Sequence, residues 1–143
     1  MRIRYKTKQE DKVSYQGYAG IPGEIVIEPT LPTPRKGFIL SHEIGHKKYP
    51  GTFRRLSLED RKKLSDEEYI QLNADTDVEG LFEELCADYY VLRISKNVYN
   101  IRETKKHLRW TKKGFSHQLT PEMIERLDRV ARRRVGYMGP EVK

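Results

Sequence analysis

Two histidines and a glutamate in the first third of the chain have the residue types and spacing of a metal site with a general base. Residues 42–46 read His-Glu-Ile-Gly-His, the pattern H-E-x-x-H. On an α-helix, His42 and His46 would lie about 40° apart around the axis and roughly 6 Å apart along it, so both imidazoles can bind one metal ion. Glu43 would lie at the edge of the same face, within reach of a water on the open side of the metal. The pattern therefore predicts a zinc site that can activate water.

A catalytic zinc takes three protein ligands and leaves one position for water, so a third ligand must come from another element. Glu84 and Asp88 are four residues apart in the strongest predicted helix and share one face of it. Glu84 can bind the metal, and Asp88 can accept the free N–H of a metal-bound imidazole. Glu83 is the alternative third ligand, although it points about 100° away from Glu84 and has Ala87, not an acid, one turn later.

Short strands precede the motif. β-Branched residues make 23–28 the best strand, and residues 2–6 alternate enough to form another. Between them, Gly17, Gly20 and Pro22 predict a turn or loop. Prolines at 29, 32 and 34 end the second strand and exclude a helix before Arg35.

Helical patterns dominate the rest of the chain. The first runs from residue 36 to the Pro-Gly pair at 50–51, and the strongest covers 77–95. Helix starts are expected at Ser57 and Ser65, and Thr120-Pro121 opens a last helix that ends at Gly136. Residues 96–119 are basic and contain one or two short elements.

These elements predict an α+β fold, in which a short N-terminal sheet packs on the helix carrying residues 42–46. A second helix carries Glu84, and the small residues Gly45 and Ala87 would let the two helices approach closely. The 143 residues fit one compact domain, 1–143, with 96–143 as its basic C-terminal helical extension.

The charge distribution leaves two interpretations open. The formal net charge is +7, and much of the excess lies late in the chain. A solvated helix face explains it; alternatively, the basic C-terminal half binds nucleic acid or an acidic partner. Zinc-finger spacing and a phosphate-binding loop motif, which would favour nucleic acid or nucleotide, do not occur in the sequence.

Composition also restricts the environment of the protein. Cys86 is the only cysteine, so we expect no internal disulfide and a small core residue at this position. The first residues have no apolar run behind them, unlike a signal peptide. No stretch approaches the ~20 apolar residues of a membrane span. We therefore expect a soluble, cytoplasmic protein that does not contact membranes.

The two motifs together resemble a known family. His42-Glu43-Ile44-Gly45-His46 followed by Glu84-x-x-Ala87-Asp88 is similar to the gluzincin zinc metallopeptidases, especially the small intracellular types, the minigluzincins and the ImmA/IrrE-type proteases. The resemblance covers roughly residues 23–95 and implies a zincin-like fold. It implies Zn²⁺ on His42, His46 and Glu84, with Glu43 as general base and Asp88 behind a ligand. It also implies that strand 23–28 is an edge strand that pairs with the bound peptide.

The expected activity is hydrolysis of peptide bonds in a peptide or protein substrate, with Glu43 moving the proton of a zinc-activated water. Some minigluzincins are latent because a C-terminal segment blocks the cleft, and residues 137–143 are long enough to do so. The alternative is a zinc-containing regulatory or nucleic-acid-binding protein with little or no peptidase activity.

The residue that stabilises the oxyanion stays open. Larger gluzincins use a downstream histidine or tyrosine, and this chain offers His107, His117, Tyr99 and Tyr137. The two histidines are otherwise expected at the surface of the basic segment. Trp110 with Phe115 is expected to form a packed cluster in preference to a substrate-binding platform.

Overall fold

A computed structural model describes residues 1–10, 14–49 and 76–143 of the chain. These residues form three strands and four helices. The fold is α+β, as predicted. The helix starts expected at Ser57 and Ser65 lie outside the described residues. The elements are β1 (Arg2–Tyr5), β2 (Gly17–Tyr18), β3 (Glu24–Ile27), α1 (Thr33–Lys48), α4 (Thr76–Ile94), α5 (Val98–Phe115) and α6 (Pro121–Val135).

The sheet has the order β1-β3-β2, with β3 parallel to β1 and antiparallel to β2. The expectation that residues 23–28 form an edge strand is therefore wrong, because β3 is paired on both sides. The edge next to α1 is β2, in the segment predicted as a turn. A Cβ at Gly17 would lie only 2.4 Å from Cγ2 of Ile39, so this glycine lets the backbone of β2 rest directly on α1.

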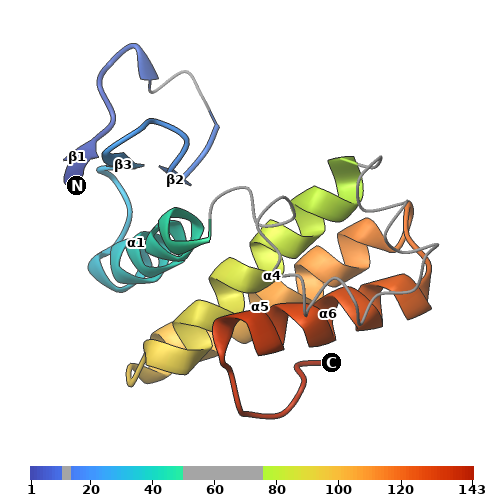
Figure 1. The fold of residues 1–143 in the computed structure, drawn as a ribbon. Helices are drawn as coiled ribbons and strands as arrows, with labels where there is room; N and C mark the ends of the chain where they lie inside the picture. The colour runs from blue at the N-terminus through green and yellow to red at the C-terminus, as the bar shows by residue number, and fades with distance from the viewer. Residues whose placement is uncertain (11–13, 50–75) are drawn as a thin grey trace.

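Helix α1 lies between the sheet and the other helices (Figure 1). On its sheet side, Ile25 and Ile27 of β3 pack against Phe38 and Ile39 of α1 in one buried cluster. A larger core joins α4, α5 and α6, and Cys86 is fully buried in it, as predicted. Because apolar residues anchor α1 on both sides, the residues of the H-E-x-x-H pattern have a fixed position.

Two helices extend further than predicted. Helix α1 begins at Thr33 and contains Pro34 in its first turn, where the missing N–H costs no hydrogen bond. Helix α5 is one helix of 18 residues where one or two short elements were expected. The Asn97 side chain caps it at a distance of 3.2 Å from the N–H of Asn100. A buried stripe of Thr104, Leu108 and Thr111 anchors it, a stripe that the many surrounding lysines and arginines obscure in the sequence.

The C-terminal tail packs along α5. Val142 is buried in the helical core, and its carbonyl accepts a hydrogen bond of 2.7 Å from Nζ of Lys112. The carbonyl of Lys143 accepts one of 2.9 Å from Nε of Arg109. A tail that kept the protein latent would lie in the cleft over the site, whereas this tail lies against α5. Some of the basic residues of this half therefore hold the chain end.

Among the described residues, no helix is both long enough and apolar enough to cross a membrane.

Candidate metal centre

The site is built where α1 crosses α4. A Cβ at Gly45 would lie 2.8 Å from the carbonyl oxygen and 2.9 Å from Cα of Ala87, so the two backbones are in direct contact, as the small residues predicted. Glu84 lies one turn before Ala87 on α4. The close crossing therefore brings its carboxylate opposite His42 and His46 of α1.

Two imidazole nitrogens and a carboxylate converge at this crossing. Nε2 of His42 lies 3.0 Å from Nε2 of His46, and each lies 3.1 Å from a carboxylate oxygen of Glu84. Ligands of a tetrahedral zinc at about 2.0–2.1 Å lie about 3.3 Å apart, so a small shift would admit the ion. Glu84, and not its neighbour Glu83, supplies the carboxylate. Two imidazoles and a carboxylate therefore fit a transition-metal ion at this place.

Asp88 lies behind this set and is fully buried. Its Oδ1 is 2.8 Å from Nδ1 of His42, and its Oδ2 is 2.6 Å from Nδ1 of His107. Each carboxylate oxygen accepts the Nδ1–H of one histidine, so when His42 gives up its other proton, its Nε2 lone pair becomes available to a metal. Asp88 thus has the position that the sequence predicted for it, with a second histidine added.

His107 is the residue that the sequence did not place. It was expected at the surface or as one of four candidates for oxyanion stabilisation, and α5 brings its ring 4.9 Å from the ring of His42, with its Nε2 3.9 Å from Oε2 of Glu84. His42, Glu84 and His107 form a cluster that could hold a metal ion. No local pattern marks His107, because its position depends on how α5 crosses α4. The other three candidates for oxyanion stabilisation, His117, Tyr99 and Tyr137, do not line the hollow above the site.

Burial and neighbouring charges shift the pKa values of several groups in the site. Burial lowers the pKa of His42, but the carboxylates of Asp88 and Glu84 outweigh burial and hold that pKa well above its ordinary value. Burial raises the pKa of Glu84, yet hydrogen bonds with His42 and His46 lower it overall. Burial raises the pKa of Glu43, which has no such hydrogen bond to compensate. Glu43 therefore holds a proton more tightly than Glu84 does.

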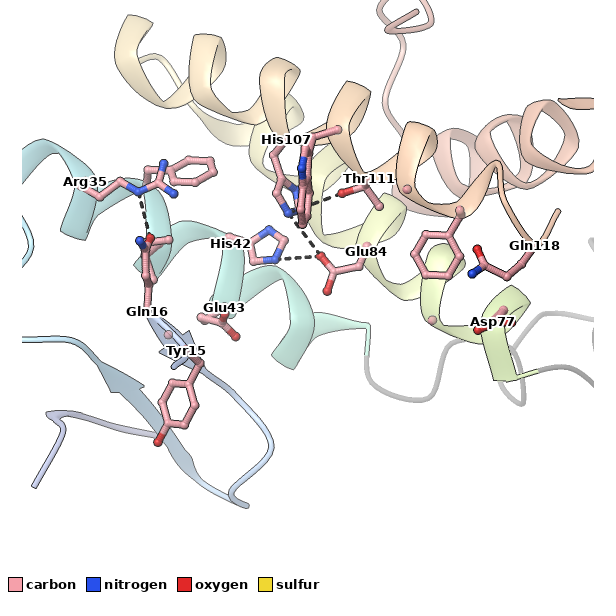
Figure 2. Close-up of a pocket in the computed structure, with 17 residues that line it drawn as sticks. Tyr15, Gln16, Arg35, His42, Glu43, Asp77, Glu84, His107, Thr111 and Gln118 are labelled. Atoms are coloured by element: carbon pink, nitrogen blue, oxygen red, sulfur yellow. Dashed lines mark hydrogen bonds and ion pairs between the residues drawn. The ribbon is translucent and has the colours of Figure 1, made fainter. Parts of the chain in front are cut away.

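A hollow of about 840 Å³ opens over His42, Glu84 and His107, between β2, α1, α4 and α5. In Figure 2, His42 and Glu84 face one another in its centre, with His107 beside them and Glu43 toward β2. We call it the main hollow. Trp110 and Phe115 both line it, but Trp110 is 73% exposed and only Phe115 packs against the helical core, so the two do not share the packed cluster that was expected.

The edge of β2 borders Glu43. A Cβ at Gly17 would lie 3.0 Å from Cγ and 3.3 Å from Oε1 of Glu43. The N–H of Glu28 donates to the carbonyl of Gln16, and Gly17 is opposite Ile27 in the antiparallel register. Pairs alternate between bonded and non-bonded along such a ladder, so the N–H and C=O of Gly17 point away from β3. Within the described ranges, no strand pairs with this outer edge.

Comparison with known proteins gives no relative: no protein-family model matches the chain, and no curated protein or solved structure is significantly similar to it. The interpretation of the site therefore depends on its residues and their geometry.

Proposed function

We propose that this chain is a zinc-dependent peptidase of gluzincin type, with the metal on His42, His46 and Glu84. The observation that carries the proposal is the convergence of the two Nε2 atoms and the Glu84 carboxylate, with contacts of 3.0–3.1 Å, beside a buried glutamate on the wall of the main hollow. A structural zinc site closes all four positions with protein ligands and needs no base beside it. Glu43, next to the set and bound to none of its members, favours hydrolysis.

His42, His46 and Glu84 would hold the zinc, which would supply a Lewis acid able to polarise a carbonyl and to make a bound water acidic near neutral pH. Glu43 takes the proton of the attacking water and delivers it to the leaving amine. Its raised pKa suits both transfers, because a carboxylate that holds a proton more tightly is a better base. Asp88 would keep His42 in the tautomer whose Nε2 faces the metal, and it also fixes His107, whose Nε2 lies 3.9 Å from Oε2 of Glu84.

The substrate peptide is expected to lie along β2, not along β3 as the sequence suggested. The outward N–H and C=O of Gly17 can pair with an extended chain, which places its backbone beside Glu43. This arrangement selects for peptides that can become extended and against folded segments.

Two variants with different losses test the proposal. Glu43→Gln removes the base but no ligand, so zinc should stay bound while cleavage of unfolded casein falls by about 10²–10⁴. Glu84→Ala should lose both zinc and cleavage. Zinc content by mass spectrometry and fluorogenic peptide hydrolysis, each with a chelator control, measure the two effects. Undiminished cleavage by Glu43→Gln would exclude Glu43 as the base, and full zinc occupancy in Glu84→Ala would exclude Glu84 as a ligand.

A further inference from the structure

A second, smaller hollow adjoins the main hollow. It has a volume of about 390 Å³ and lies between the first turns of α1 and the middle of α5. Four residues line both hollows, so the smaller one is a side branch of the larger and not a separate cavity: Arg35, Phe38, His107 and Trp110. We call it the side hollow. A chain bound beside the candidate metal ligands would pass its mouth.

Trp110 forms one wall of the side hollow. It is the only tryptophan of the chain, and 73% of its surface is exposed. It lies one turn after His107 on α5, with the two ring centroids 5.9 Å apart. Asp88 fixes His107, so the indole stands beside a ring that is held in place. When an apolar group covers an indole that was exposed to water, the free energy of the complex falls.

Arg35 forms the opposite wall and is held by three neighbours. Its guanidinium lies 4.8 Å above the ring of Phe38, its Nε donates to Oε1 of Gln16 over 3.1 Å, and its Nη1 is 3.6 Å from Oε2 of Glu103. Figure 2 shows Arg35 and Gln16 joined on the side of the main hollow away from Gln118. A wall that is fixed before binding loses little conformational entropy when the ligand enters.

The two walls select the same chemistry. An indole stacks on aromatic rings, and a guanidinium also stacks on an aromatic face. Arg35 and Lys106 together outnumber the single acid, Glu103, so a lysine or arginine side chain would meet net positive charge. We propose that the side hollow is a specificity subsite, in which Trp110 and Arg35 hold an aromatic side chain of the substrate near the scissile bond.

This inference rests on the proposed peptidase function, but it can be measured separately. The probes are blocked nine-residue peptides of Ala, Ser and Gly in which a single Phe is moved one position at a time. Binding to the zinc-loaded Glu43→Gln variant is followed by the fluorescence of Trp110, which no other tryptophan obscures. Cleavage of the same peptides by the parent protein gives kcat/KM for each position.

One Phe position should bind about tenfold more tightly than the all-small peptide, with a saturable change in indole fluorescence. The same position should raise kcat/KM about tenfold in the parent protein. Trp110→Ala should bring that ratio close to one, Trp110→Phe should restore most of it, and Val98→Ala, equally exposed on the same helix, should leave it unchanged.

The outcomes separate the two proposals. Cleavage without a preferred Phe position, or a preference that survives in Trp110→Ala, overturns the subsite and leaves the peptidase function standing. A preference for Asp or Glu in place of Phe, in a second peptide set, overturns the aromatic assignment. A fluorescence change at one Phe position without any cleavage supports the subsite and overturns the peptidase function. Absence of both cleavage and a fluorescence change overturns both.

Discussion

Gly45 of α1 rests on the backbone of Ala87 of α4, where a Cβ would lie 2.8 Å from the Ala87 carbonyl oxygen. Helices whose side chains separate them lie 8–10 Å apart, and a glycine at the crossing allows a closer approach. That approach brings Glu84 within 3.1 Å of both histidines. The geometry of the candidate metal site thus depends on Gly45, which has no side chain and is not itself a candidate ligand.

Gly45→Ala should therefore destabilise the fold and weaken metal binding together. The added methyl group meets backbone atoms that cannot rotate away, and overpacking of this kind costs about 1–3 kcal/mol. Gly37→Ala, in the same helix with open space around it, is the matched control and should stabilise by up to about 1 kcal/mol. Urea unfolding of both variants measures the difference. Equal effects of the two substitutions would contradict the tight crossing.

Asp88→Asn should lower metal affinity about 10–100-fold with little change in zinc stoichiometry at saturation. Asp88 accepts from Nδ1 of both His42 and His107, and an amide has only one oxygen with which to accept. Competition with a chelator of known affinity gives the dissociation constant. Glu83→Gln, which neutralises a carboxylate on the same helix outside the ligand set, serves as control and should bind metal like the parent.

Much of this site could be predicted because it depends on helical periodicity. His42 with His46, and Glu84 with Asp88, are each four residues apart, and that spacing fixes a shared face wherever the helices lie. The sequence could offer His107 only as one of four candidates for oxyanion stabilisation, because its place beside Asp88 arises only when α5 packs against α4.

The strand order escaped the sequence for a similar reason. The β-branched residues of β3 identify a buried strand, but they do not show how many neighbours it has. Two-residue β2 has almost no sequence pattern, and its place is set by the contact of Gly17 with Ile39 on α1. The edge at which a peptide is expected to pair is therefore β2, and not β3 as the sequence suggested.

The stabilisation by metal should increase as the pH rises from about 6 to about 8. In the metal-free protein, the raised pKa of His42 contributes stability that is fully present below about pH 6.5 and is lost as the pH rises through the folded pKa. The metal-bound protein needs His42 neutral, so proton competition weakens over the same range. The Tm difference between zinc-loaded and chelator-treated protein should widen with pH. A difference that narrows would show that His42 is not the group exchanging its proton for the metal.

Removal of residues 137–143 should destabilise the protein without activating it. Val142 is buried in the helical core, and its carbonyl accepts from Nζ of Lys112, so truncation exposes apolar surface and takes one acceptor from a largely buried ammonium that keeps Asp128 as its partner. The two losses together correspond to about 2–4 kcal/mol. Val142→Ala should reproduce part of this loss, whereas Met138→Ala, at a residue that is 94% exposed, should have no effect. Thermal unfolding and peptide hydrolysis are measured on the same samples. A gain in hydrolysis after truncation would show that the tail blocks the main hollow. That result would contradict the position of the tail along α5.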